Sequence, residues 1–326
     1  MDIKDIRKKY KILVITHADL DGAGCAIIIK SAYRGTKGAV FIQQANDYPT
    51  ADKFVREALK EDHWDKIYIT DISVSKETAE YIEEHDKDRV VLIDHHPGLD
   101  FLKEYSWCYI EESDKDDPNT PSGTSLVYDY FRECRTEFLS TFVELVRQYD
   151  TWAWKNHFNN EQPKQLNAYL NIVGFKDFIN IMTSRIYDED IFTDFDRDML
   201  YYKEKEIELN IRSKSNYVSV KVIDGMRVGF VFAEKNLSEL GNYIMESRDD
   251  IDCIVMYNLA KGIVSIRSAV KNGTYVNCTK MAKKWFNGGG HTLAGGGHIS
   301  EEKMRLIQEI LFDKPINEKI DFIENK

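Results

Sequence analysis

One stretch of the sequence limits the fold more than any other. The apolar run 90–93 leads directly into Asp94, His95 and His96, and a Pro-Gly pair follows. A continuous apolar run without alternation is typical of a strand buried on both faces. The three polar side chains are therefore expected where this strand leaves the sheet, at the edge where open α/β sheets bind ligands. Because such side chains are costly to bury alone, they need partners, and metal ions are suitable ones.

The same pattern occurs twice earlier, where an apolar run again ends in acidic or imidazole side chains: 12–16 is followed by His17, Asp19 and Asp21, and 67–70 by Asp71. Helix-like segments separate the runs. Alternating strands and helices predict an α/β fold with a parallel sheet covered on both faces. Since parallel strands end at one edge of a sheet, the polar side chains after all three runs are predicted to meet in space.

Bulk properties limit the class of protein. A net charge of -11 and a pI near 5.3 argue against a broad basic face for long nucleic acid, duplexes included. The five cysteines are scattered, which favours a reducing compartment over a disulfide framework. Neither an apolar signal core nor a run of bilayer length is visible, so we expect a cytoplasmic protein without membrane association.

The chain is expected to contain two domains. Residues 1–187 form the α/β domain, and the charged segment 188–215 is a long connecting helix. Residues 216–326 form a second, smaller α/β domain, with a hairpin across Asp224 and Gly225 and a closing helix at 301–312.

The alternation His17-x-Asp19-x-Asp21 lets side chains two apart share one face of an extended segment and chelate together. Oxygen and imidazole ligands without thiolate suit Mn²⁺ or Mg²⁺. Asp71 stands at the end of another strand, and Asp150 at a helix-to-loop junction. Each Asp taken alone is more often the N-cap of the next helix. Their joint occurrence at one predicted edge favours a metal site.

A second outstanding stretch is 288–298, with two Gly-Gly-Gly runs around His291. Ordering so many glycines costs entropy, and close approach of backbone N–H groups to a phosphate would account for it. A flexible loop without a ligand is the alternative. Arg267, at the end of a predicted strand, suits bidentate phosphate recognition or is a surface residue. The tryptophans, Trp152 and Trp154 among them, are predicted to be core residues, although aromatic rings can also stack on bases.

In order and spacing, the motifs of the first domain resemble those of the DHH phosphoesterase superfamily, which includes RecJ exonucleases and nanoRNases. The matching residues are His17-x-Asp19-x-Asp21-Gly22, Asp71, Asp94-His95-His96 and Asp150. The run Gly288-Gly289-Gly290-His291 resembles the glycine loop of the companion DHHA1 domain.

The resemblance implies two divalent ions, Mn²⁺ or Mg²⁺, and an activated water that attacks phosphorus in line. One ion would be held by His17, Asp19 and Asp71, and the other by Asp21, Asp71, His95 and Asp150. His96 would be a hydrogen-bond donor or general acid. Asp94 is either a further ligand or orients a neighbouring imidazole, and the second role is favoured.

The resemblance also implies substrate-binding roles for Arg267, Gly288, Gly289, Gly290, His291 and Ser125. Without it, the segment 122–125 indicates only a helix N-terminus, with Ser122 or Thr124 as N-cap.

We therefore expect a nanoRNase-like phosphodiesterase that releases mononucleotides from very short oligonucleotides lying between the two domains. Linear or cyclic dinucleotides and 3′-phosphoadenosine 5′-phosphate are further candidate substrates. The alternatives are a RecJ-like exonuclease on longer single strands and a catalytically silent nucleotide sensor. A family II pyrophosphatase is disfavoured, because that group lacks the glycine loop. The sequence leaves open RNA or DNA preference, polarity, the physiological metal and the oligomeric state, for which a homodimer is one option.

Overall fold

The computed structural model describes residues 10–36, 38–114 and 116–305. The chain divides into two compact units, Met1–Tyr201 and Tyr202–Lys326, and each has its own sheet. The division falls inside helix α8 (Asp194–Ser215), within the segment expected to be the connecting helix. The domain limits at residues 187 and 216 stay predictions. Of the closing helix predicted at 301–312, residues 301–305 are helical and the rest lie outside the described residues.

The first unit is built on a parallel sheet of five strands. These are β1 (Lys11–His17), β2 (Ala39–Ala45), β3 (Lys66–Thr70), β4 (Val90–Asp94) and β5 (Cys108–Ile110). Their order is β2-β1-β3-β4-β5, and every neighbouring pair is parallel. The predicted α/β fold is confirmed, and β4 is buried along its whole length, as its continuous apolar run indicates.

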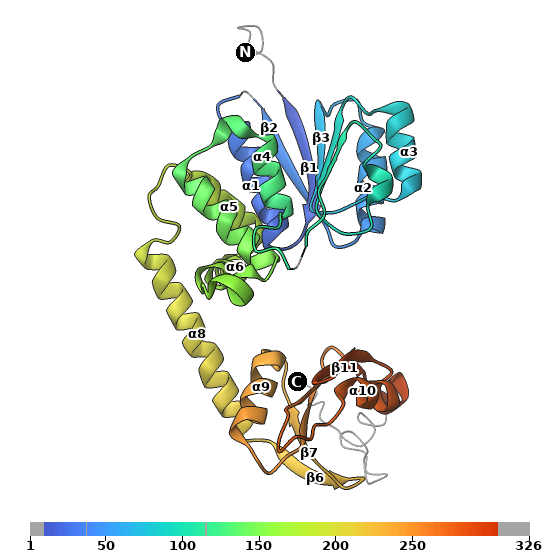
Figure 1. Cartoon of the computed structure of the whole chain (residues 1–326), viewed down its shortest axis with the longest axis vertical. Helices are drawn as coiled ribbons and strands as arrows, with labels where there is room; N and C mark the ends of the chain where they lie inside the picture. The colour runs from blue at the N-terminus through green and yellow to red at the C-terminus, as the bar shows by residue number, and fades with distance from the viewer. Residues whose placement is uncertain (1–9, 37, 115, 306–326) are drawn as a thin grey trace, which may run out of the picture. The chain divides into compact units, whose positions relative to one another are not determined.

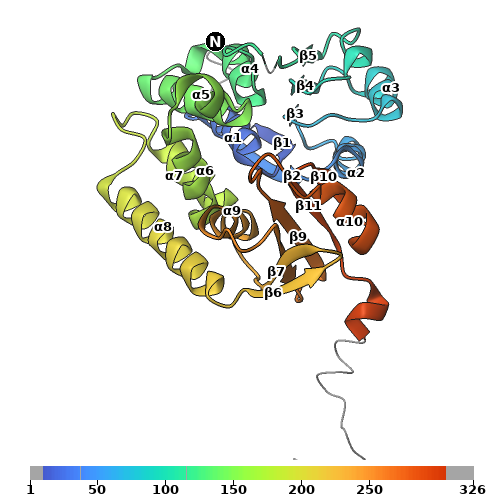
Figure 2. The same ribbon diagram turned by 60° about the horizontal axis from the view of Figure 1, so that its bottom comes forward.

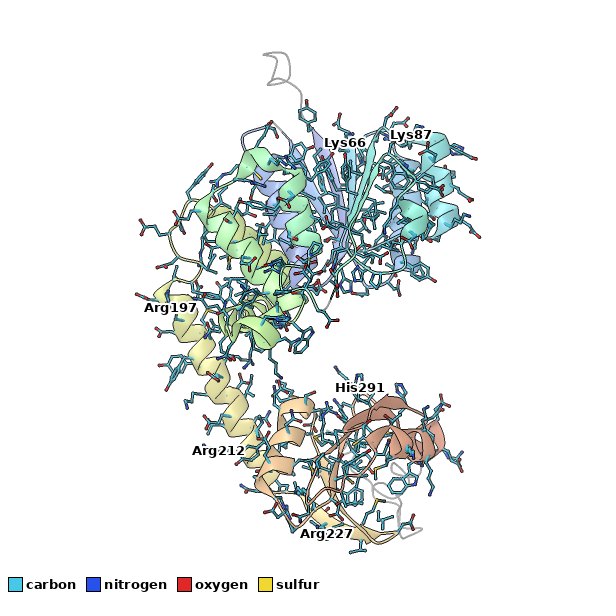
Figure 3. The ribbon with its side chains drawn as sticks, viewed as in Figure 1. Lys66, Lys87, Arg197, Arg212, Arg227 and His291 are labelled. Atoms are coloured by element: carbon cyan, nitrogen blue, oxygen red, sulfur yellow. The ribbon has the colours of Figure 1, made fainter. Side chains whose placement is uncertain are left out.

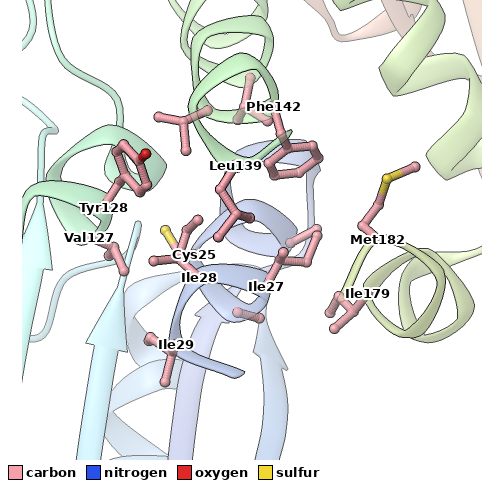
Figure 4. Packing of buried hydrophobic residues seen from close by; sticks show 14 of the residues in the cluster. Cys25, Ile27, Ile28, Ile29, Val127, Tyr128, Leu139, Phe142, Ile179 and Met182 are labelled. Carbon is pink, nitrogen blue, oxygen red and sulfur yellow. The ribbon is translucent and has the colours of Figure 1, made fainter. Parts of the chain in front are cut away.

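Helices cover both faces of this sheet (Figure 1). One face carries α1 (Leu20–Ala32), α4 (Gly123–Tyr130), α5 (Glu137–Asp150), α6 (Gln162–Val173) and α7 (Phe175–Ser184), and the other carries α2 (Tyr48–Leu59) and α3 (Lys76–His85). Helix α1 is central, because Ile27 and Ile28 are fully buried against α5 and α7 (Figure 4). Burial of each such side chain stabilises the fold by about 1.5–3 kcal/mol.

Two strands of this sheet, β2 and β5, were not among the strands predicted from the sequence. Both lie at the edges of the sheet. Strand β2 is only partly buried and carries Gln43 and Gln44, and β5 has three residues. Edge strands of this kind lack the continuous apolar run that marks a central strand of a parallel sheet.

The strand order places a topological switch point at β1. The chain leaves β1 for β2 on one side and returns to β3 on the other. Ligands of open α/β sheets bind outside the carboxyl ends of the strands at such a point. The residues that follow β1 and β3 are therefore the ones expected to form a site.

An ion pair fixes the start of α8. The Asp196 carboxylate is buried and accepts hydrogen bonds from Arg185 Nη1 (2.5 Å), from the Thr193 backbone N–H (2.8 Å) and from Thr193 Oγ1 (2.8 Å). Burial opposes ionisation of Asp196, but the bonds from Arg185, Tyr169 and Thr193 lower its pKa to about 2.

Although α8 has 22 residues, no helix in the described ranges is long and apolar enough to cross a bilayer.

The second unit has a mixed sheet of six strands in the order β10-β11-β9-β8-β7-β6. The elements are β6 (Ser219–Ile223), β7 (Met226–Phe232), α9 (Leu237–Ser247), β8 (Cys253–Asn258), β9 (Ile263–Ser268), α10 (Cys278–Phe286), β10 (Gly289–His291) and β11 (Ala294–His298). Helix α9 packs on one face and α10 on the other (Figure 2). The predicted hairpin is present: Asp224 and Gly225 both have positive φ, as its two-residue turn requires.

The glycine run forms a hairpin of two short strands, which corrects its description as a loop. Strand β10 pairs antiparallel with β11, and β11 pairs with β9. Glycine is required by close approach: a Cβ on Gly288 would lie 1.9 Å from the Gly296 carbonyl oxygen, and one on Gly297 would lie 2.5 Å from the Phe286 carbonyl oxygen. Packing against neighbouring backbone thus accounts for part of the glycine content.

Candidate metal centre

The end of β1 and the segment that follows it supply three of the predicted ligands. Asp19 is the N-cap of α1, where its Oδ1 accepts the Gly22 N–H (3.0 Å), and its Oδ2 lies 2.7 Å from His17 Nδ1. Asp19 is therefore a helix cap as well, and the bond from Gly22 orients its carboxylate beside His17. Neither of the residues for which capping was the alternative is an N-cap, since Ser75 caps α3 and Asp150 is the last residue of α5. Burial opposes the shift, but the bonds from His17 and Gly22 lower the pKa of Asp19.

The Asp21 carboxylate is held by the N-terminus of α4. The Gly123 N–H donates to Oδ2 (2.6 Å) and the Thr124 N–H to Oδ1 (2.9 Å), while Thr124 Oγ1 donates to the Asp21 carbonyl (2.7 Å). A helix N-terminus favours such an anion. Gly123 is required here, because a Cβ would lie 2.8 Å from Asp71 Cβ. Sequence reasoning missed Gly123 and Thr124 in this role, and their only signal was the helix start itself.

Asp71 follows β3 and is buried. Its backbone is left-handed, with a φ of 55°, a conformation that Asp and Asn tolerate better than other side chains with a Cβ. Its Oδ1 lies 3.3 Å from His95 Nε2. Its Oδ2 is buried without a hydrogen-bond partner among the described residues. Such an orphaned oxygen is unusual, and a bound cation would supply its partner.

The triplet 94–96 begins with the last residue of β4, and its two imidazoles contact different groups. Asp94 is fully buried, and its Oδ1 accepts hydrogen bonds from the His95 N–H (2.8 Å) and from His96 Nδ1 (2.7 Å). This bond raises the pKa of His96, whose side chain is half exposed. Asp94 Oδ2 is buried and lacks a hydrogen-bond partner in the part of the chain that the structure describes. Asp94 thus contacts the imidazole of His96, which is the contact that its predicted role of orienting a neighbouring imidazole requires.

The tautomer of His95 follows from its neighbours. Ser113 Oγ donates to the Pro121 carbonyl oxygen (2.5 Å), which can only accept. The hydroxyl has one proton, so at its 2.7 Å contact with His95 Nδ1 the oxygen must accept. His95 therefore carries its proton on Nδ1 and presents the Nε2 lone pair to the site. Ser113 was not predicted, because nothing local in 111–119 indicates this contact.

Three carboxylates surround that lone pair. His95 Nε2 lies 3.3 Å from Asp71 Oδ1, 3.5 Å from Asp21 Oδ2 and 3.6 Å from Asp150 Oδ2. In each of three groups, the ligand atoms lie within 4.8 Å of one another: His17, Asp19 and Asp71; Asp21, His95 and Asp150; and Asp71, Asp94, His95 and His96. The structure thus brings together every predicted metal ligand at one edge of the sheet.

The electrostatics of this edge are unfavourable without a cation. Burial and the charges of Asp21, Asp19 and Asp150 raise the pKa of Asp71 well above its ordinary value. Burial, with Asp21 and Asp19, raises the pKa of Asp150 to about 8. Burial lowers the pKa of His95, so its neutral form is favoured. Neutral imidazole and converging carboxylate oxygens are ligands for divalent cations. Asp71 Oδ2, which has no partner among the described residues, could act as a further ligand of this kind.

The predicted substrate residues of the second unit form a separate set. Arg267 lies on β9, and its guanidinium donates to Ser238 Oγ (2.9 Å), to Ser265 Oγ (3.1 Å) and to the Ile266 carbonyl (2.9 Å). His291 ends β10 and is exposed (Figure 3). Gly288 precedes β10, and Gly289 and Gly290 lie within it.

Ser125 belongs to the first unit, in α4. Its hydroxyl is part of a capping box: it donates to the Ser122 carbonyl (2.9 Å) and accepts the Ser122 N–H (2.9 Å). Ser122, one of the two expected candidates, is the N-cap. A substrate contact by Ser125 stays a prediction, and its hydroxyl already has two partners within the helix start.

The tryptophans after Asp150 differ from expectation in one respect. Trp152 is 58% exposed, so the prediction that it is a core residue is wrong. Trp154 is half-buried. Trp152 comes directly after the C-cap of α5 and has the left-handed backbone conformation that ends the helix.

Known proteins resemble this chain over most of its length. Residues 11–149 match the DHH family, N-terminal domain. The chain is 33% identical over 300 residues to oligoribonuclease NrnB of Bacillus subtilis (strain 168), a match that covers 89% of this chain and 73% of that protein. It is 23% identical over 337 residues to a 3′,5′-cyclic-nucleotide phosphodiesterase of Helicobacter pylori (strain ATCC 700392 / 26695), covering 87% and 92% of the two chains.

Among solved structures, RecJ in complex with Mn²⁺ from Thermus thermophilus is 14% identical and has a TM-score of 0.48. That match covers 94% of this chain and 52% of the RecJ chain. A likeness this distant leaves substrate and metal open. The identity with NrnB, over most of both chains, is far closer, and together with the match at residues 11–149 it shows that this protein belongs to the DHH family of phosphoesterases.

Proposed function

We propose that the protein is a metal-dependent phosphodiesterase that degrades very short oligonucleotides to mononucleotides. The observation that carries the proposal is the gathering of imidazole and carboxylate ligand atoms at the switch point of the first sheet. The relative that shares 33% identity is named an oligoribonuclease, which supports the choice of substrate. The net charge of -11 also favours a short substrate over a long strand held by many phosphate contacts.

Two divalent cations, Mn²⁺ by expectation or else Mg²⁺, would be held by the predicted ligands, with His17, Asp19 and Asp71 at one position and Asp21, Asp71, His95 and Asp150 at the other. When bound, they supply the positive charge that activates a water and stabilises charge developing on phosphate oxygens. Asp71 can contribute to cation binding, because its Oδ2 has no partner among the described residues. Ser113 keeps the His95 Nε2 lone pair directed at the site.

His96 would act on the leaving group. Its Nδ1 is bonded to the buried Asp94, which raises the pKa of the imidazole and leaves the other nitrogen, Nε2, for the substrate. An imidazolium at this position can donate its Nε2 proton to the departing oxygen. His96 is half exposed, so a substrate phosphate can reach it.

The second unit would bind the rest of the substrate. Arg267 is held by three hydrogen bonds that fix the direction of its guanidinium, as bidentate phosphate recognition requires. His291 and the backbone of Gly289 and Gly290 lie on the neighbouring hairpin, two strands from β9. We propose that these residues bind a terminal phosphate or nucleotide.

A series of substrate lengths tests the proposal. Purified protein is incubated with Mn²⁺ and with single strands from two to about 24 nucleotides, the upper length exceeding several single-strand site sizes. The expected result is mononucleotide release that is fastest for the shortest strands. Turnover mainly on long strands would support the RecJ-like alternative instead. Nucleotide binding without hydrolysis, with metal bound, would support the sensor.

A second candidate substrate follows from the relative that is named a 3′,5′-cyclic-nucleotide phosphodiesterase. The same assay should therefore include a cyclic mononucleotide, a cyclic dinucleotide and 3′-phosphoadenosine 5′-phosphate. Hydrolysis of any of these faster than the linear dinucleotide would change the assigned substrate while leaving the chemistry in place.

A further inference from the structure

The end of α5 has a residue that a helix end does not favour. Thr151 is the C-cap, and the next residue, Trp152, has a φ of 60°. Helices often end with a left-handed residue at this position, and it is usually Gly or sometimes Asn. A bulky side chain is unfavourable there, because its Cβ crowds the backbone. Trp152 is therefore at a position where Gly would make a more stable helix end.

Burial does not account for this tryptophan, because its side chain is 58% exposed. Trp154 stacks on it, with ring centroids 6.2 Å apart and ring planes 28° from parallel. The indole is thus supported by one neighbour, and most of its surface remains open to solvent. Trp154 Nε1 is buried and has no hydrogen-bond partner in the described ranges.

The position of this pair matters. Asp150, whose Oδ2 lies 3.6 Å from His95 Nε2, is two residues before Trp152. Two residues of extended chain span at most about 7 Å, so the Trp152 Cα lies within about 7 Å of the Asp150 Cα, whose carboxylate faces the proposed metal centre. An exposed aromatic ring that is supported by a second ring, on an unfavourable backbone two residues from a proposed metal ligand, has a physical use: the flat face of a nucleobase can stack on it without sequence preference.

We propose that Trp152 is the stacking platform for one nucleobase of the substrate, with Trp154 supporting its ring. This inference rests on the proposed function, since the base would belong to the nucleotide whose phosphate is cleaved at the metal centre. The stacked base would help to align the phosphodiester with the centre. Stacking that accepts any base would allow action on short strands of mixed sequence.

The backbone conformation makes a sharp test available. Trp152→Gly removes the ring and suits the left-handed position, so its unfolding free energy should equal or exceed that of the wild type. Loss of stacking, about 1–3 kcal/mol per base, predicts a KM for a dinucleotide about 5- to 150-fold higher. The kcat should change little. Trp152→Phe, which keeps a flat ring, should stay close to the wild type.

Combining Trp152→Gly with a substrate that lacks one base gives a double-mutant cycle, in which the KM values show whether the ring and that base interact. Dinucleotides are prepared with either base replaced by hydrogen. For one of them, the wild type and Trp152→Gly should have the same KM, because the ring has no base left to bind. Equal loss on both abasic substrates and the intact dinucleotide would overturn the proposal, as would a Trp152→Gly variant that is less stable than the wild type.

Direct binding separates this inference from the proposed function. Indole fluorescence of the protein with Mn²⁺ is titrated with adenosine monophosphate, and Trp152→Phe identifies the contribution of this ring. Quenching that is present in the wild type and lost in Trp152→Gly supports the platform even if no dinucleotide is hydrolysed. Hydrolysis of dinucleotides with unaltered KM in Trp152→Gly would leave the proposed function in place and remove the platform.

Discussion

Two buried aspartates in the first unit have opposite electrostatics. Asp196 accepts hydrogen bonds from Arg185 and Thr193, and its pKa is lowered to about 2. Asp71 is equally buried, and burial together with the surrounding carboxylates raises its pKa. Its Oδ1 lies 3.3 Å from His95 Nε2, and its Oδ2 has no partner among the described residues. A carboxylate whose partners all come from the protein stabilises the fold. A buried carboxylate without such partners keeps its charge only beside a cation and is otherwise protonated.

The largest expected effect is on activity. Asp71→Asn keeps the size of the side chain, and Asn tolerates the left-handed backbone at this position. The variant loses the charge that two cations would share, so kcat/KM for a dinucleotide should fall by about 10³-fold or more. The metal-free variant should melt at the same temperature as the wild type or higher, because a buried like-charge contact is gone. Asp196→Asn is the matched control and should keep its kcat/KM.

Addition of metal tests the same contrast through stability. Because the proposed ligands converge only in the folded chain, free Mn²⁺ at about 100 times the Kd of the proposed site should stabilise the protein by about 2.7 kcal/mol. Asp196→Asn should gain the same amount, and Asp71→Asn much less. Thermal unfolding with Mn²⁺ and with a chelator measures this. An equal gain in Asp71→Asn would mean that the cation binds elsewhere.

The pH dependence of the Asp196 pair supplies the next test. Its folded pKa of about 2 lies below the ordinary 3.8, so the pair stabilises the fold above pH 3.8, and this contribution is lost as the pH falls toward 2. The shift corresponds to about 2 kcal/mol. Urea unfolding should show Asp196→Asn less stable by about that amount near neutral pH, with the difference disappearing in acid.

Asp194→Asn is the control for this experiment. Asp194 is fully exposed and lies 3.8 Å from Arg197, a surface pair that contributes at most about 1 kcal/mol. A loss in Asp194→Asn as large as that in Asp196→Asn would show that charge at the start of α8, rather than burial of the pair, determines the effect.

Asp71 and Asp196 also differ in how far the sequence could predict their contacts. Asp71 and the triplet at 94–96 follow apolar runs, and parallel strands end at one edge, so their meeting follows from local pattern and topology. Asp196 has no such signal, since its partner Arg185 precedes it in an irregular segment. The contacts of Asp21 with Gly123 and Thr124 span about a hundred residues and depend on how α4 packs. Likewise, the exposure of Trp152 depends on where α5 ends.

The smallest expected effect concerns the proton of His95. Ser113 Oγ donates to Pro121 and must accept from His95 Nδ1, which leaves the Nε2 lone pair for a cation. In Ser113→Ala the Nδ1 proton loses its acceptor, while Nε2 can still bond Asp71 Oδ1, 3.3 Å away, if the proton moves there. A protonated Nε2 does not bind metal. Because removal of such a supporting hydrogen bond typically costs 10- to 100-fold in metal affinity, the Kd for Mn²⁺ should rise by about tenfold.

Ser113→Thr keeps the hydroxyl and should restore the affinity. Nitrogen NMR of the metal-free protein adds a reading that a general loss of packing would not produce. The His95 signals should show the proton on Nδ1 in the wild type and in Ser113→Thr, and a shift toward Nε2 in Ser113→Ala. If Ser113→Ala keeps both the wild-type tautomer and the wild-type affinity, the imidazole is directed by the three carboxylates alone. The two sites would then differ further. Protein donors hold the Asp196 carboxylate, whereas the imidazole of His95 would be positioned only by carboxylates whose charge a cation neutralises.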